Sequence, residues 1–170
     1  MGERISSFTA AVVNAPREIA GALDPIFSKH HIKAVSFQDV YNLTASIPRM
    51  SGNGESIVVI SGLEEFEKED FAVVKIVRQH FGNSCLICIN GHGINGNLER
   101  VLQAVKLGIE IVTSAGMAEP VIARFKDDLQ VKSDGNSADI PKAESFEKRM
   151  SGMMGSFFLT SAEQKALIKE

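Results

Sequence analysis

Short apolar runs alternate with longer amphipathic segments along the chain up to residue 130. Five of these runs predict β-strands and lie at residues 8–13, 33–37, 56–61, 85–89 and 109–113. The third and fourth runs, SIVVIS and CLICI, are apolar at nearly every position, which is typical of strands that a parallel sheet buries on both faces. Between and after the runs, apolar residues recur at helical spacing. This spacing predicts helices over residues 17–31, 39–50, 70–81, 98–107 and 120–129.

Proline, glycine and asparagine mark the ends of these elements. Pro25 is expected to kink the first helix or to restart it with Asp24 as a new N-cap. Gly82-Asn83 and Gly108 are expected to end the third and fourth helices. Five strand-then-helix units in succession favour an α/β fold, in which helices cover both faces of a doubly wound, five-stranded parallel sheet.

The residues after the last predicted helix differ in composition. We expect one domain over residues 1–130, a polar linker over 131–141 and an apolar helical tail over 142–170. The tail carries an apolar cluster at Met150, Met153, Met154, Phe157 and Phe158. A segment this short cannot form its own core. We therefore expect the tail to pack on its own domain, on another copy or on a partner, or to begin a further region.

Composition limits the classes of function. The net charge of −3 gives no general electrostatic reason to expect nucleic-acid binding by this segment. Cys85 and Cys88 stand three apart in one predicted strand, so they should point to opposite faces of the sheet and neither bridge nor share a metal. With no disulfide framework, we expect a cytoplasmic protein. We also expect no cofactor and no metal. The N-terminus lacks a long apolar run, so no contact with a membrane is expected.

A glycine-rich loop, NGHGINGN, follows the fourth predicted strand and precedes a helix. Its candidate ligand or switch residues are Asn90, Gly91, His92, Gly93, Asn95 and Gly96. The glycines match G-x-G-x-x-G in letters, but the loop does not follow the first strand and the next strand does not end in an acid, as a dinucleotide site requires. Three interpretations stay open: a loop that borders a partner surface, a cradle for an anion or nucleotide, and hydrolysis by His92 with Ser61.

The order and lengths of the elements over about 125 residues resemble the receiver domain of two-component response regulators. AVKLGIEIVT, residues 104–113, is similar to the receiver pattern in which a helix ends in A-x-x-x-G-A before the fifth strand. SIVVISG, residues 56–62, is similar to the third strand, which in receivers delivers the phospho-accepting aspartate. The resemblance implies a flavodoxin-like sheet with strand order 2-1-3-4-5.

The residues that carry the chemistry of the receiver family differ at each position. The family has an acidic pair after the first strand, an aspartate ending the third, a threonine or serine ending the fourth, and a lysine ending the fifth. The corresponding residues here are Asn14 with Ala15, Ser61, Asn90 or Gly91, and Ala115 with Gly116. Magnesium normally needs carboxylate ligands, and a serine cannot be phosphorylated by the aspartyl route. Glu64 and Glu65 follow Ser61 and could carry charge there, but a solvated loop is the favoured interpretation.

The resemblance therefore implies a pseudo-receiver, a non-enzymatic signalling module that acts through protein–protein contacts without phosphorylation. The surface that receivers use for partners and dimers corresponds here to residues 98–107, 109–113 and 120–129, which carry charges of both signs. We expect a protein partner, or a second copy in a homodimer. The alternative is a small-molecule sensor that binds an anion or nucleotide at Asn14, Ser61 and the 90–97 loop.

Overall fold

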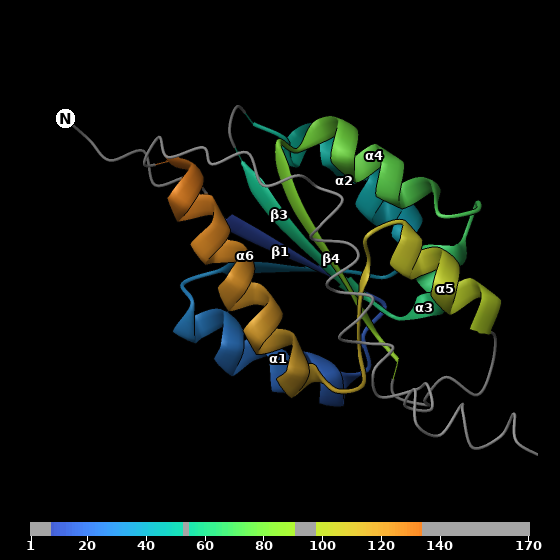
Figure 1. Cartoon of the computed structure of the whole chain (residues 1–170), viewed down its shortest axis with the longest axis horizontal. Coiled ribbons are helices and arrows are strands. Elements are labelled where there is room, and N and C mark those ends of the chain that lie inside the picture. The colour runs from blue at the N-terminus through green and yellow to red at the C-terminus, as the bar shows by residue number, and fades with distance from the viewer. Residues whose placement is uncertain (1–7, 53–54, 91–97, 134–170) are drawn as a thin grey trace, which may run out of the picture. The chain divides into compact units, whose positions relative to one another are not determined.

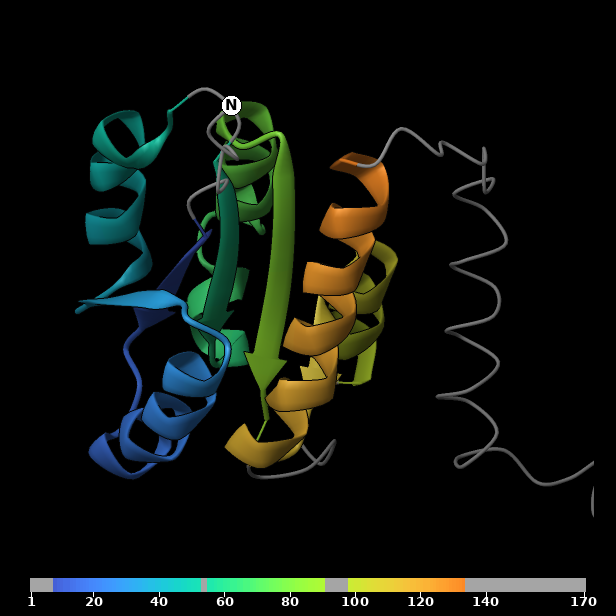
Figure 2. The ribbon, with the colours of Figure 1, turned by 90° about the vertical axis from the view of Figure 1, so that its left-hand side faces the viewer.

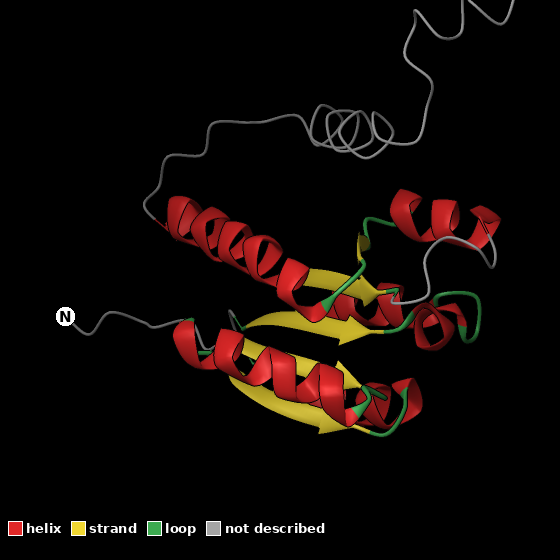
Figure 3. Cartoon of the chain, turned by 90° about the horizontal axis from the view of Figure 1, so that it is seen from below, coloured by secondary structure: helices red, strands yellow, loops and turns green. Residues whose placement is uncertain are grey.

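Five parallel strands form a single sheet in the computed structural model, which describes residues 8–52, 55–90 and 98–133. The order across the sheet is β2-β1-β3-β4-β5, so the predicted flavodoxin-like fold is confirmed. The strands are β1 (Phe8–Val13), β2 (Lys33–Phe37), β3 (Ser56–Ser61), β4 (Asn83–Ile89) and β5 (Glu110–Val112). Their arrowheads point the same way in Figure 3, which places the carboxyl ends of the strands at one edge of the sheet.

The bounds of three strands, from β2 at one edge of the sheet to β3 in its centre, follow the prediction, and the bounds of β4 and β5 depart from it. The bounds of β1, β2 and β3 agree with it. Strand β4 begins two residues earlier than expected, because Asn83 and Ser84 continue the parallel pairing with β3, and Figure 2 shows these two strands side by side. Strand β5 keeps only three of its five predicted residues, those that pair with Ile87, Cys88 and Ile89 of β4.

Helices connect the strands and lie on both faces of the sheet. They are α1 (Arg17–Lys29), α2 (Val40–Met50), α3 (Leu63–Glu67), α4 (Ala72–His80), α5 (Leu98–Lys106) and α6 (Ala118–Ser133), with a 3₁₀ turn at Ala115–Met117. In Figure 1, α1 and α6 lie on one side of the strands, and α2, α4 and α5 lie on the other. The carboxylate of Asp39 accepts a hydrogen bond from the N–H of Asn42 at 2.8 Å and so caps α2. Gly108 follows α5 with φ of 80°, where a glycine avoids the cost of a left-handed side chain.

Three helical predictions need correction. Pro25 does not restart α1: the helix continues through it, because Leu23, Ile26 and Phe27 on either side of the proline are buried in the same core. Helix α3 was not predicted at all. Helix α6 continues to Ser133, so the first three residues of the predicted linker are helical, while the rest of that linker and the tail lie outside the described residues.

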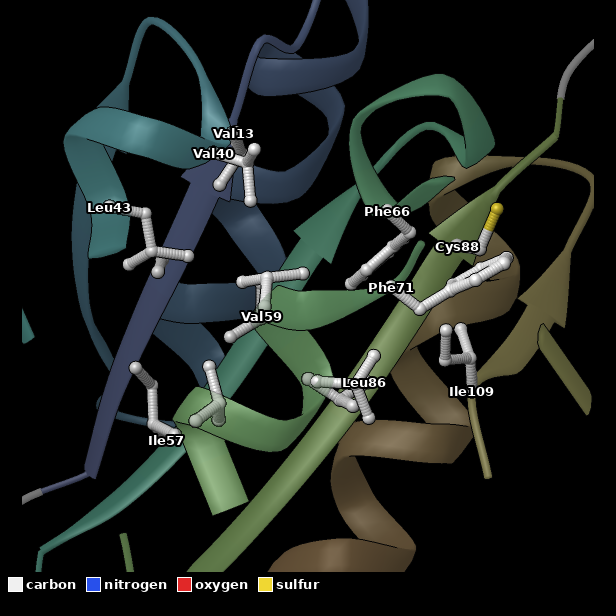
Figure 4. Close-up of a cluster of buried hydrophobic side chains, with 14 of the residues drawn as sticks. Val13, Val40, Leu43, Ile57, Val59, Phe66, Phe71, Leu86, Cys88 and Ile109 are labelled. Atoms are coloured by element: carbon white, nitrogen blue, oxygen red, sulfur yellow. The ribbon is translucent and has the colours of Figure 1, made fainter. Parts of the chain in front are cut away.

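Two hydrophobic cores, one on each face, hold the sheet between the helices. Along β1, Ala11 and Val13 belong to the core under α2, α4 and α5, whereas Ala10 and Val12 belong to the core under α1 and α6. Figure 4 shows the first of these cores. Cys88 lies in it and Cys85 packs against the other, so the prediction that the two cysteines face opposite ways is confirmed. Burial raises the pKa of the Cys88 thiol to about 12, helped by the negative charge of Glu67.

No helix in the described part of the chain is long and apolar enough to cross a membrane.

Candidate functional site at the carboxyl edge of the sheet

The strand order reverses between β1 and β3, and ligands of open α/β sheets bind at the carboxyl ends of the strands at such a point. The register pairs Val12 of β1 with Ile60 of β3, so Val13 and Ser61 end their strands beside each other. Asn14 follows the first of these strands, and α3 follows the second after one residue, Gly62. We call this place the β1–β3 crevice and define it by Asn14, Ser61 and Glu65.

Ser61 is the last residue of β3. Its side chain is buried, and its hydroxyl donates a hydrogen bond of 2.9 Å to the main-chain carbonyl oxygen of Val13. The hydroxyl therefore joins the ends of β1 and β3. This role is structural, because burying a hydroxyl without a hydrogen-bond partner would be costly.

Asn14 turns the chain out of β1. Its φ of 47° lies in the left-handed region, which asparagine tolerates better than most residues. Its main-chain N–H donates to the carbonyl oxygen of Phe37 at 2.9 Å, and its side-chain amide donates to Oε1 of Glu65 at 3.0 Å. Asn14 thus connects the end of β2 to a carboxylate on the far side of the crevice.

Glu65 is buried, which corrects the expectation of a solvated loop after Ser61. Besides the bond from Asn14, its carboxylate accepts a hydrogen bond of 3.0 Å from the main-chain N–H of Val40, the first residue of α2. It also accepts one of 2.7 Å from Nζ of Lys68. Glu64, one residue earlier, is exposed as expected. A carboxylate therefore does occupy the crevice, but it comes from α3 and not from the end of β1.

The carboxylate of Glu65 is ionised and its charge is balanced within the protein. Burial alone would raise its pKa, but the hydrogen bonds from Lys68, from the N–H of Val40 and from Asn14 together outweigh burial and lower the pKa below its usual value. The same hydrogen bond raises the pKa of Lys68. Glu65 and Lys68 form an ion pair, and the negative charge of Asp39 also raises the pKa of Lys68.

Three residues with a left-handed backbone conformation follow Lys68 directly in the chain. In the connection between α3 and α4, Glu69, Asp70 and Phe71 have φ values of 52°, 54° and 61°. Such a conformation costs about 1–2 kcal/mol for each residue other than glycine, and less for aspartate. Phe71 is buried in the core beside Phe66 and Cys88, as Figure 4 shows, and this anchor helps to hold the turn. Strain of this kind is kept only where the surroundings determine it strongly.

A separate pocket of about 490 Å³ lies over the ends of β1 and β2, next to the first turns of α1. None of its lining residues carries a charge, and three offer a neutral amide or hydroxyl group. The lining consists of Val12, Asn14, Ala15, Ala20, Ser36, Phe37 and Gln38. Of the residues predicted for a ligand site, Asn14 therefore lines this pocket and Ser61 and Asn90 do not.

The glycine loop was the other predicted feature of this edge. Asn90 follows β4 and its main-chain N–H donates to the carbonyl oxygen of Val112 at 2.8 Å, which extends the pairing of β4 with β5. Gly91, His92, Gly93, Asn95 and Gly96 lie outside the described residues, as do the tail residues Met150, Met153, Met154, Phe157 and Phe158. Among residues 8–52, 55–90 and 98–133, no three histidine, cysteine or acidic side chains come together as a metal site.

Sequence reasoning missed α3, and with it Lys68 and the left-handed turn; it named Glu65 as a possible charge beside Ser61 but favoured a solvated loop there. One signal was present: Leu63 and Phe66 stand three apart with charged residues around them, the spacing of a short amphipathic helix. The fold is that of a flavodoxin-like domain, and its β1–β3 crevice contains an ion pair between Glu65 and Lys68. No known protein-family model matches the chain, and no curated protein is significantly similar to it in sequence.

Proposed function

We propose that the protein is a non-enzymatic signalling or regulatory module of the cytoplasm, a pseudo-receiver that acts through protein contacts and without phosphorylation. One observation carries the proposal: a buried carboxylate, Glu65, is bound to Asn14, Lys68 and the N–H of Val40 in the crevice where receiver chemistry would take place. The crevice is therefore occupied by the protein's own groups.

Each step of an aspartyl phosphorelay meets an obstacle in this crevice. Magnesium would have to take the carboxylate of Glu65 from Lys68, yet that carboxylate is the one acidic group that we find in the crevice within the described residues. A phosphoryl group would have to reach Ser61, whose hydroxyl is buried and bound to Val13. The first change would break the ion pair between Glu65 and Lys68, and the second would break the hydrogen bond that joins the ends of β1 and β3, so signalling by this route is disfavoured.

The side of the domain formed by α5, β5 and α6 is the proposed partner surface. It carries paired charges, since Arg124 contacts Glu110 at 2.8 Å. It also has three largely exposed apolar side chains, Leu98, Met117 and Val131, with exposed fractions of 57%, 51% and 57%. Mixed charge around isolated apolar side chains suits a protein partner better than nucleic acid. The partner can be a different protein or a second copy of this chain.

Phosphorylation by a small donor tests the proposal. The full chain is incubated with acetyl phosphate and magnesium, and its intact mass and light scattering are recorded beside those of an active receiver as the positive control. We expect no phosphoryl adduct and no change in oligomeric state. An adduct that is lost on mild alkaline treatment, as acyl phosphates are, would contradict the proposal.

The uncharged pocket beside Asn14 favours one alternative, a sensor for a small molecule. Its amide and hydroxyl groups at Asn14, Ser36 and Gln38 would suit a neutral polar ligand better than an anion. A ligand at a hundredfold excess over its Kd stabilises a protein by about 2.7 kcal/mol, which a thermal melt detects readily. We expect nucleotides and cyclic dinucleotides to leave the melting temperature unchanged. A saturable increase with one of them would favour the sensor.

A further inference from the structure

The first two residues of the connection between α3 and α4 hold two different parts of the domain. Lys68 donates to Glu65 at 2.7 Å and so belongs to the crevice. Glu69 accepts a hydrogen bond of 3.1 Å from the hydroxyl of Tyr41 on α2. The ammonium group of Lys68 also lies 5.6 Å from the centre of the Tyr41 ring, within reach of a cation–π interaction.

The third residue, Asp70, reaches α5. Its carboxylate oxygen Oδ1 accepts hydrogen bonds from Nη1 of Arg100 and from Nε2 of Gln103, each at 3.3 Å. Arg100 also donates to the side-chain oxygen of Gln103 at 3.1 Å, so the three side chains form one cluster. Consecutive residues of one segment therefore contact the crevice, α2 and α5 in turn.

The backbone of this segment makes these contacts dependent on one another. Glu69, Asp70 and Phe71 are all left-handed, and main-chain hydrogen bonds close the turn from Asp70 N–H to Glu67 and from Ala72 N–H to Glu69, at 3.0 and 3.2 Å. A change of one residue to the ordinary conformation would redirect the chain that follows it. Relaxation of one residue would therefore disturb the contacts of its neighbours with α2 and α5.

We infer that the α3–α4 connection is a two-state coupling element that transmits a change in the crevice to α5. In the state described here, the bond between Lys68 and Glu65 holds the start of the strained turn, and the turn holds α5 through Asp70. Disturbing the crevice removes the first anchor, favours relaxation of the turn and loosens α5. The inference rests on the proposed function only in assigning α5 to a partner surface.

Amide hydrogen exchange in a double-mutant cycle tests this coupling. Exchange of the α5 amides from Leu102 to Lys106, taken relative to exchange of the buried β3 amides so that global destabilisation cancels, is measured in the full-length chain, in Glu65→Gln, in Asp70→Ala and in the double variant. We expect Glu65→Gln to speed exchange in α5 by at least about fivefold, the lower end of typical couplings between sites. In the Asp70→Ala background the same change should add less than about twofold, because the connection to α5 is already broken.

Two further variants keep the test decisive. Glu64→Gln removes an exposed charge from the same helix and should leave exchange in α5 unchanged. If Glu65→Gln does not fold, Lys68→Met disturbs the same network from its more exposed partner and should give the same pattern. The coupling would be refuted if Glu65→Gln sped exchange in α5 equally with and without Asp70, or if it left exchange in α5 unchanged. The measurement needs no partner and no phosphoryl donor, so its failure is distinct from failure of the proposed function.

Discussion

Replacing Glu65 by glutamine gives the sharpest stability prediction, because the change keeps the shape of the side chain and removes its charge. In the native protein this carboxylate accepts three hydrogen bonds, from Asn14, Lys68 and the main-chain N–H of Val40. Glutamine keeps one acceptor oxygen and turns an amide donor toward groups that are themselves donors. At least one donor is then left without an acceptor, and the N–H of Val40 is buried.

The expected loss of stability follows from the number of hydrogen bonds that the Glu65 carboxylate accepts. Leaving a buried donor unpaired costs about 1–3 kcal/mol, and hydrogen bonds to an ionised group contribute about 1.5–3 kcal/mol each. Allowing for partial rescue by the glutamine oxygen, we expect Glu65→Gln to lower the free energy of unfolding by about 2–4 kcal/mol. A typical domain has about 5–15 kcal/mol in total, so the loss is large. Urea denaturation followed by circular dichroism measures it.

The pH dependence of this loss identifies its cause. The pKa of Glu65 is lower in the folded protein than in the unfolded chain, where it is about 4.3. A lowered folded pKa stabilises the protein fully above the unfolded pKa, and this contribution disappears as pH falls through the folded pKa. The difference between the native protein and Glu65→Gln should therefore be constant near pH 6–7 and shrink below about pH 4.3.

Glu64→Gln is the matched control, since an exposed surface substitution changes stability by no more than about 0.5 kcal/mol. If Glu65→Gln stays within that same margin at neutral pH, the carboxylate does not hold the crevice together. A loss of the expected size that persists unchanged at low pH would mean that shape, and not charge, is responsible.

Four further predictions follow from individual contacts. Ser61→Ala should lower the free energy of unfolding by about 1–2 kcal/mol in urea denaturation, because a buried hydrogen bond is lost. A smaller change would contradict the structural role of the hydroxyl. Asn14→Ala should be about 1 kcal/mol less stable than Asn14→Gly, because only alanine is strained in the left-handed region; equal stabilities would contradict this. Gly108→Ala should lose more than about 1 kcal/mol in the same assay, because its φ is 80° and the added methyl group would stand 2.7 Å from Nη2 of Arg78. Deleting residues 142–170 should leave a cooperative melt by circular dichroism but alter oligomeric state or partner binding in light scattering; loss of the melt would place the tail in the core.

The central strands were predictable because their pattern is local. Strand β3 is buried at every position, so its apolar run in the sequence is continuous and identifies it without knowledge of its neighbours. Strand β5, at the edge, is set by how far its pairing with β4 extends, and sequence alone overestimated its length. Of the two outcomes expected at Pro25, a restart does not occur, because α1 continues through the proline with buried residues on both sides of it.

The crevice was only half predictable. That the ends of β1 and β3 carry an asparagine and a serine in place of carboxylates could be seen directly in the sequence. The burial of Glu65 could not, because its partners Asn14 and Val40 lie 51 and 25 residues away in sequence. A glutamate-rich segment next to a strand is ordinarily a solvated loop, and only the folded arrangement supplies the donors that make its burial favourable.

Titration with beryllium fluoride and magnesium tests the central claim most directly, because beryllium fluoride imitates the acyl phosphate of an active receiver. Amide chemical shifts of the full-length chain are recorded before and after both are added, with an active receiver as the positive control. Because Glu65 is bound to Lys68 and the Ser61 hydroxyl to Val13, we predict that the spectrum of this protein stays unchanged. Saturable shifts centred on Ser61 and Asn90 would show that the crevice opens to phosphoryl chemistry and would contradict the account.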